Sequence, residues 1–224
     1  MIRRSTCALA FLLAATACRP TGGGGDDGGA DVVGSGTPAR ASRSVPTFTA
    51  IDASGAFALE VESGAKAADL VIEGDDNIVP LFVAEVSGGT LSLHLPGGSY
   101  ALKSRLVVHV AASSVTRLVA AGAIEADLHG LAGDRFDVDL SGACRVGARG
   151  TVDRFALQAT GANDVAASAL VARAVELHLS GASKAHVQAT EALTVEANGA
   201  SHVLYRGKPR VETSASGTSS VDPE

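Results

Sequence analysis

A short turn motif recurs through the second half of the chain at a spacing close to 20 residues. The sequence reads DLSGACRV at 139–146, and ATGANDV, LSGASKA, ANGASHV and SASGTSSV follow it. The anchor glycines of the copies are Gly122, Gly142, Gly161, Gly181, Gly199 and Gly217, spaced by 20, 19, 20, 18 and 18 residues. A repeat of this length with strand-type alternation is typical of a solenoid, in which each copy forms one rung that only the neighbouring rungs can cover.

Aligning the copies on the anchor glycine separates apolar from polar positions. The residues four before, two before and four after the glycine are apolar in the first five copies: Leu118, Val138, Leu157, Leu177, Val195; Ala120, Leu140, Ala159, Leu179, Ala197; Ala126, Val146, Val165, Ala185, Val203. Residues between them, such as Asp137, His178 and Glu196, are polar. Because side chains alternate across a strand, we expect the apolar columns inside and the polar ones in water. The glycines are expected at corners, where they adopt positive φ readily.

The column three residues after the anchor glycine alternates in charge. It reads Glu125, Arg145, Asp164, Lys184 and His202. In-register residues of adjacent rungs lie about 4.8 Å apart, so opposite charges would attract along the stack. We therefore predict a charge ladder that fixes register, with each exposed pair contributing about 0–1 kcal/mol.

The preceding segment, from residue 45 onward, consists of short alternating runs such as FTAIDASGAFALEVESG and TLSLHLPGG, separated by Gly, Ser, Asp and Pro. This pattern predicts short strands and tight turns, and no stretch keeps a helical period. Gly55 in DASGAFALEV resembles an earlier copy of the repeat turn. The predicted fold is all-β: a right-handed parallel β-helix with about 18–20 residues per rung, preceded by a region of stacked strands, together spanning 45–224.

The N-terminus indicates export. Residues 1–17 carry Arg3 and Arg4 and then an apolar run too short to span a membrane, as in a signal peptide. The ATAC stretch ending at Cys18 resembles a bacterial lipoprotein signal, which predicts lipidation of Cys18 and attachment to a membrane. A plain secretory signal with a chance cysteine is the alternative. Residues 18–44, rich in Gly, Ser and Asp, are expected to form a flexible linker.

The charge and the cysteines argue against a nucleic-acid-binding protein and against a fold held by disulfide bonds. Loss of Arg3 and Arg4 with the signal would leave 16 basic and 24 acidic residues, so nucleic acid is not an expected partner. Cys7 would leave with the signal, and Cys144 would then have no disulfide partner. We expect Cys144 to be a small buried side chain.

The sequence contains few residue patterns that indicate metal binding or catalysis. The six histidines show no metal-binding spacing, and GDDNIV at 74–79 lacks the remaining ligands of a calcium loop, so a turn is expected there. We predict no catalytic residues, no metal and no cofactor. Phe57, Phe136 and Phe155 alternate into the core, which leaves Tyr100 and Tyr205 as the candidates for an aromatic carbohydrate platform; Tyr205 is more typical of a core cap.

The sequence resembles the head GIN domain family of putative autotransporter adhesins. The resemblance runs from Phe48 to Val221 and rests on the opening FTAIDASGAFALEVESG, the block LVIEGDDNIVPLFVAEVSGGTLSLHL, the successive S-G-A turns and the closing YRGKPRVETSASGTSSV. It implies a β-helical fold at the bacterial cell surface and brings no catalytic residues with it.

Together these features predict a non-enzymatic lipoprotein that presents a rigid solenoid surface to a surface or envelope ligand, either protein or polysaccharide. Arg19 after the lipidated cysteine, in place of an Asp retention signal, favours the outer membrane or the cell surface. The alternative is a scaffold of the periplasm or envelope that self-assembles through uncapped rungs as a homo-oligomer.

Overall fold

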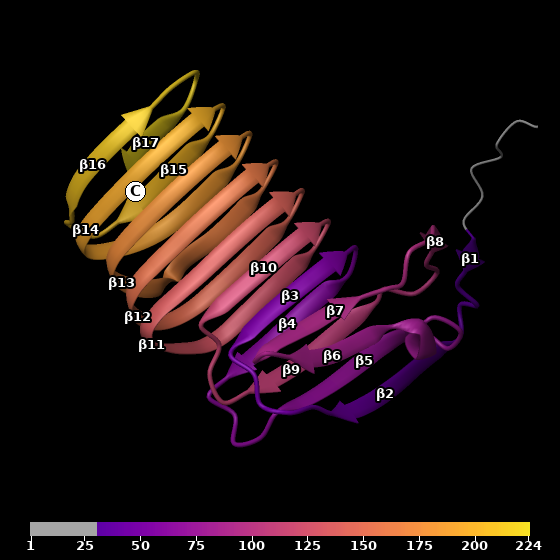
Figure 1. Cartoon of the computed structure of the whole chain (residues 1–224). Coiled ribbons are helices and arrows are strands. Elements are labelled where there is room, and N and C mark those ends of the chain that lie inside the picture. The colour runs from indigo at the N-terminus through magenta and orange to yellow at the C-terminus, as the bar shows by residue number, and fades with distance from the viewer. Residues whose placement is uncertain (1–30) are drawn as a thin grey trace, which may run out of the picture.

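The computed structural model describes residues 31–224, so the predicted signal peptide, Cys18 and the first part of the predicted linker lie outside it. The described chain is all-β apart from one 3-10 turn, η1 (Val79–Leu81). A solenoid of about five turns, residues 117–223, occupies the C-terminal part, and a mixed sheet region precedes it (Figure 1). The predicted fold class is confirmed.

The solenoid is a stack of parallel strands. Its strands are β10 (Arg117–Gly122), β11 (Glu125–Gly142), β12 (Arg145–Gly161), β13 (Asp164–Gly181), β14 (Lys184–Gly199), β15 (His202–Arg206), β16 (Arg210–Ala215) and β17 (Ser220–Pro223). Each long strand bends around one corner and pairs along most of its length with the next. The register shifts within each pair, at Leu128/Leu131 and Gly147/Arg149 for example. These shifts absorb the variation of 18–20 residues per repeat, while the glycine corner stays in register.

The N-terminal region extends both sides of the solenoid. Its strands are β1 (Val32–Val33), β2 (Pro38–Ser44), β3 (Ala50–Gly55), β4 (Ala58–Ser63), β5 (Asp69–Asp75), β6 (Val83–Ser87), β7 (Thr90–His94), β8 (Tyr100–Ala101) and β9 (Val107–Ala112). β3 and β4 pair in parallel with β10 and β11 and so form a further rung. Beyond them one side ends in the antiparallel pair β7–β6 and the other in β9–β5–β2.

The ordered fold begins earlier than the sequence suggested. Residues 38–44, which we predicted as part of the flexible linker, form β2 and pair antiparallel with β5. Ala39 and Ala41 pack against the core, and Arg43 donates hydrogen bonds from its guanidinium to the carbonyl oxygens of Phe82 (2.7 Å) and Val79 (3.3 Å). The strand escaped detection because its inward side chains are two alanines and an arginine.

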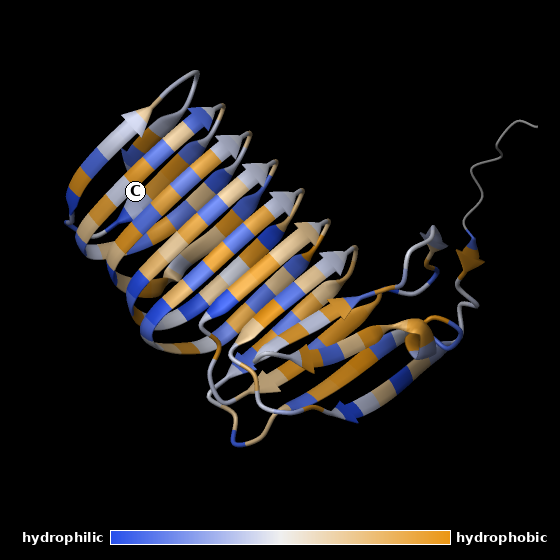
Figure 2. Ribbon diagram, in the orientation of Figure 1, coloured by the Kyte–Doolittle hydropathy of each residue, from blue (hydrophilic) through white to orange (hydrophobic). Residues whose placement is uncertain are grey.

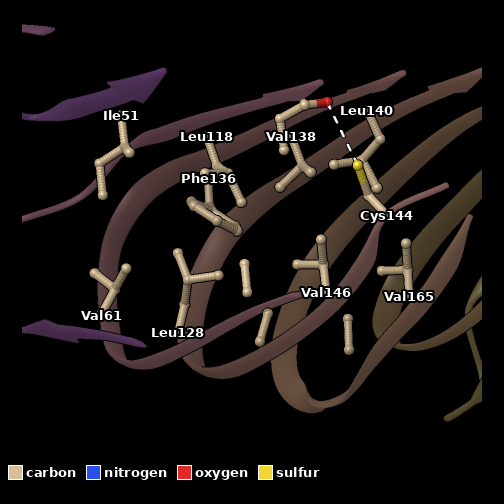
Figure 3. Packing of buried hydrophobic residues seen from close by; sticks show 14 of the residues in the cluster. Ile51, Val61, Leu118, Leu128, Phe136, Val138, Leu140, Cys144, Val146 and Val165 are labelled. Atoms are coloured by element: carbon tan, nitrogen blue, oxygen red, sulfur yellow. Dashed lines mark hydrogen bonds between the residues drawn. The ribbon is translucent and has the colours of Figure 1, made fainter. Parts of the chain in front are cut away.

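The core is a narrow column of stacked apolar side chains. All fifteen residues of the three predicted inward columns are buried, each 4% exposed or less. Hydrophobic and hydrophilic residues alternate along the solenoid strands, as Figure 2 shows. Phe136 and Phe155 stack with their ring centroids 6.0 Å apart. Cys144 is buried as predicted, and Figure 3 shows it beside Leu140 among the stacked apolar side chains.

The C-terminal rung is open. All six residues of β16 are exposed, and Val211 is 37% exposed although its counterparts in the other rungs, from Phe136 to Leu193, are buried. β16 pairs with β14 and β17 pairs with β15. The sheet edge at this end is therefore polar and exposed.

Candidate functional site: a groove along the glycine corner

The anchor glycines form a continuous corner along the stack. Gly55 and five of the predicted corner glycines pair in register from rung to rung, and Gly217 lies next to Gly199. At Gly161 φ is +110°, and a Cβ atom there would lie 2.3 Å from the carbonyl oxygen of Gly142. Glycine is thus required at this corner for two reasons: the backbone has a positive φ, and successive rungs approach too closely to admit a Cβ atom.

A buried polar column supports the corner from inside. The residue two after the anchor glycine is Cys144, Asn163, Ser183 or Ser201 in successive rungs, and each is 2% exposed or less. The side chain of Asn163 accepts a hydrogen bond from the Cys144 backbone N–H (3.0 Å) and donates to the Thr160 carbonyl (3.0 Å). The Cys144 thiol lies 3.6–3.7 Å from three carbonyl oxygens. The polar side chains tie adjacent rungs together at the turn.

An alanine strip lies on the outer side of the same corner. The residue directly after each anchor glycine is exposed: Ala56, Ala123, Ala143, Ala162, Ala182 and Ala200. From Ala123 onward, each backbone N–H group donates to the corner glycine of the preceding rung; that of Ala143, for example, donates to the Gly122 carbonyl oxygen at 2.8 Å. The strip is therefore an exposed row of methyl groups, and the ladder residues lie two positions further along each strand.

A groove of about 590 Å³ runs along this strip. Its floor includes Ala56, Ala123, Ala143 and Ala162, which belong to four successive rungs. The segment 102–106, between β8 and β9, forms part of its lining together with Glu125, Arg145 and Asp164 of the charge ladder. The groove follows the axis of the solenoid, because its floor residues occupy the same position in consecutive rungs.

The structure brings the predicted ladder residues into register. Glu125, Arg145, Asp164, Lys184 and His202 are consecutive Cα partners. Arg145 contacts Glu125 at 3.3 Å and Asp164 at 3.7 Å. Lys184 makes no ion pair with Asp164 within residues 31–224, and His202 contacts Ser220 and lies 3.9 Å from Asp222. The ion pairs are thus concentrated at the groove.

Arg105 adds a further charged residue to the N-terminal end of the charge ladder. The sequence analysis did not predict this position. Its guanidinium contacts the Glu125 carboxylate at 2.5 Å, on the side away from the next rung. The resulting series Arg105, Glu125, Arg145, Asp164 alternates in sign along the groove wall. Arg105 comes from the non-repetitive segment before β9, so no repeat alignment could have placed it there.

A second, more apolar pocket continues the groove at its N-terminal end. It has a volume of about 350 Å³ and shares Ala56, Phe57 and Leu102 with the groove. Tyr100, Leu95 and Pro96 complete its lining with the neighbouring glycines. The Tyr100 hydroxyl donates a hydrogen bond to the Pro96 carbonyl (3.0 Å), so the ring is held at this end. One continuous depression thus passes from an aromatic, apolar end to a charged end.

A buried carboxylate holds the groove wall in place. Asp75 is 1% exposed and accepts hydrogen bonds from the backbone N–H groups of Gly36, Lys103 and Ser104 at 3.0–3.2 Å. The Ser104 side-chain hydrogen bond, together with these backbone donors and against the opposing effect of burial, holds the pKa of Asp75 below its ordinary value. The GDDNIV turn, rejected as a calcium loop, thus fastens segment 102–106 to the N-terminal strands.

Residues 47–209 match the family described as putative auto-transporter adhesin, head GIN domain. The chain belongs to this family. A comparison with curated proteins finds no significant match.

Solved structures share the head GIN fold seen here. A putative adhesin from Bacteroides fragilis NCTC 9343 aligns with a TM-score of 0.68 at 21% identity, covering 86% of this chain and 99% of that one. A putative adhesin from Parabacteroides merdae ATCC 43184 gives 0.56 at 15% identity, covering 86% and 98%. A putative lipid binding protein from Parabacteroides distasonis ATCC 8503 gives 0.54 at 20% identity, with the same coverages. At these identities the likeness concerns the fold.

The remaining polar clusters of this head GIN domain are surface ion pairs. His178 lies 3.1 Å from both Glu176 and Glu196, and these carboxylates raise its pKa, the hydrogen bond with Glu176 most strongly. His109 contacts Glu60 at 2.9 Å. Residues 31–224 contain no group of three or more His, Cys, Asp or Glu side chains arranged to hold a metal ion. In the same part of the chain, no helix has the length and apolar character to cross a membrane.

Proposed function

We propose that this head GIN protein is a non-enzymatic exported lipoprotein, anchored through Cys18 at the outer membrane or cell surface. In this proposal its solenoid presents the corner groove to a ligand of the cell surface or envelope. The observation that carries the proposal is the groove itself, whose floor repeats over four rungs and whose walls are fixed by ion pairs and by Asp75. Two of the structural neighbours are described as putative adhesins, which supports a binding role.

The groove is suited to binding because little of it has to be ordered when a ligand arrives. Its floor consists of the bends that follow the corner glycines, which are hydrogen-bonded between rungs, and its alanine side chains have no rotamer freedom to lose. Its wall is held by the buried Asp75 carboxylate through three backbone donors. A preorganised surface loses less conformational entropy on binding, so even a shallow contact can be selective.

The anchor is tested by Cys18→Ser. The substitution should release the protein from membranes and stop processing by the lipoprotein peptidase. Fractionation and the mass of the mature chain measure both effects, and surface protease treatment of intact cells tells an outward orientation from a periplasmic one. Unchanged membrane association and mature mass in the variant would refute the lipid anchor.

The groove is tested with a substitution of its floor. Ala143→Arg places a long side chain in the groove, whereas Ala182→Arg places the same side chain in the same column beyond it. Each new arginine stands two residues before a basic ladder residue, so the change in local charge is matched. Binding of the full-length protein to cell-envelope fractions should be lost in the first variant and kept in the second; equal binding by both would exclude the groove as the site.

The exposed C-terminal rung favours a second candidate, a self-assembling scaffold. β16 leaves one edge of the sheet unpaired, and such an edge can accept a strand from another copy. Sedimentation of the full-length protein over a range of concentrations would detect assembly. Thr213→Lys, which puts a charge on this edge, should abolish it. A monomer at all concentrations would eliminate this candidate.

A further inference from the structure

We infer that the corner groove binds a neutral, extended polysaccharide, with about one sugar ring per rung. The inference rests on the proposed binding role of the groove and names the class of its ligand. Three features carry it: the spacing of the rungs, the alternating charges of the wall, and the alanine floor with an aromatic ring at one end.

The spacing of the rungs favours a glycan over a peptide. A ligand lying along the groove meets the same position of successive rungs every 4.8 Å or so. An extended polypeptide advances about 3.3 Å per residue, and its same-side side chains repeat at about twice that distance, so it falls out of step with the rungs. An extended chain of pyranose rings advances by roughly one rung per ring. Each ring can therefore meet an equivalent alanine.

The wall chemistry favours hydroxyl groups without net charge. Arg105, Glu125, Arg145 and Asp164 follow one another with contacts of 2.5, 3.3 and 3.7 Å, so each charge is balanced by its neighbours. Lys103 also lines the groove, so its charged side chains are three basic and two acidic, and this small excess attracts neither a polyanion nor a polycation strongly. The row does offer donors and acceptors in alternation, guanidinium N–H and carboxylate oxygen, and a sugar hydroxyl can both donate and accept.

The floor and the end pocket suit the apolar faces of sugar rings. Ala56, Ala123, Ala143 and Ala162 provide methyl groups at one level, and no larger side chain interrupts the strip. Tyr100 closes the N-terminal end beside Leu95 and Leu102, where a ring edge or face can pack against the phenol. Four floor positions, the first and last of which lie roughly 14 Å apart at the rung spacing, correspond to a site for about four rings.

Affinity electrophoresis of the full-length protein tests this assignment. Native gels containing hydroxyethyl cellulose, glucomannan, xylan or alginate serve as probes, the first three neutral and the last anionic. At least one neutral polymer should retard the wild-type protein. Retardation should be lost in Ala143→Arg and in Ala162→Arg, and kept in Ala182→Arg. Urea unfolding of each variant verifies the fold, and soluble oligosaccharides should compete with rising strength up to about four rings.

Two results would overturn the inference: no retardation by any neutral polymer, or retardation that Ala182→Arg abolishes as fully as Ala143→Arg. Retardation by alginate alone would likewise contradict the neutral class. The proposed function is judged separately, on envelope fractions. If groove-dependent binding to those fractions survives periodate oxidation and is destroyed by protease, the groove binds a protein; the glycan assignment then fails while the binding role stands.

Discussion

At the scale of single residues, the corner glycines are constrained by their positive φ and by the close approach of the next rung. Gly161 is subject to both constraints and Gly55 to the first alone. Gly161 has φ +110° and would place a Cβ 2.3 Å from a backbone oxygen, whereas Gly55 has φ +116° with no atom within 4 Å of the same point. The first position is subject to strain and to a clash, the second to strain alone. The pair therefore allows the effect of close rung packing to be measured directly.

We predict that Gly161→Ala destabilises the protein by about 3 kcal/mol or more, because both effects act, and that Gly55→Ala costs about 1–2 kcal/mol through conformation alone. Urea unfolding followed by circular dichroism measures both values. Equal losses for the two variants would show that the rungs can move apart to admit a methyl group, contrary to the close packing described.

At the scale of strands, the charge ladder sets the alignment of neighbouring rungs. We predict that Arg145→Glu lowers the free energy of unfolding by about 1 kcal/mol at low salt, because it places three acids in a row, and by less at high salt. Arg149 is exposed on the same strand outside the ladder, so Arg149→Glu is the matched control and should change little. The urea midpoints of both variants are measured over a range of salt concentrations. A loss of stability in Arg145→Glu that does not depend on salt would contradict an electrostatic cause.

His178 gives the strands β13 and β14 a pH-dependent contact. Its pKa is raised in the folded state by Glu176 and Glu196, so the charged form stabilises the fold. That contribution is fully present below the unfolded value of about 6.5 and is lost as the pH rises through the higher folded pKa. His178 is partly exposed, so we expect a change below about 1 kcal/mol. His178→Gln should remove this pH-dependent change from a plot of unfolding free energy against pH. If the change persists in the variant, another titratable group causes it.

The period of the sequence predicted those features of the strands that repeat. Once the copies are aligned on the anchor glycines, the position of a residue relative to its glycine predicts the inward columns, the corner and the register of Glu125 with Arg145. Two other features were missed: β2, which lies outside the repeat and whose alternation uses Ala and Arg, and the buried column at Asn163, which follows the repeat but whose polar side chains imitate an exposed turn. The groove was missed because the segment 102–106, which includes Arg105 and forms part of its wall, lies outside the repeats.

At the scale of the whole molecule, the solenoid is assembled from interchangeable units. Neighbouring rungs contact one another, and the corner glycines mark equivalent cut points. We predict that deletion of Ala182–Gly199, one complete rung outside the groove, leaves a folded protein that still binds the ligand of the groove. Deletion of 182–190 removes half a rung and should unfold the C-terminal part. Circular dichroism and limited proteolysis distinguish these outcomes; unfolding of both variants would show that the rungs are not interchangeable.

The place where the chain enters the fold has a mechanical consequence. β1 pairs with β8, so Val32, close to the start of the described residues, is joined directly to Tyr100, and Asp75 links Gly36 to the wall segment beside it. A pulling force on residue 31 thus acts first on the two-residue pairing of β1 with β8 and a few hydrogen bonds, and then on the pairing of β2 with β5, before it reaches the long pairings of the solenoid. If the molecule is anchored through its N-terminus as proposed, the groove wall would yield first under flow, so the load at which the groove deforms is set by this small junction rather than by the extensive core behind it.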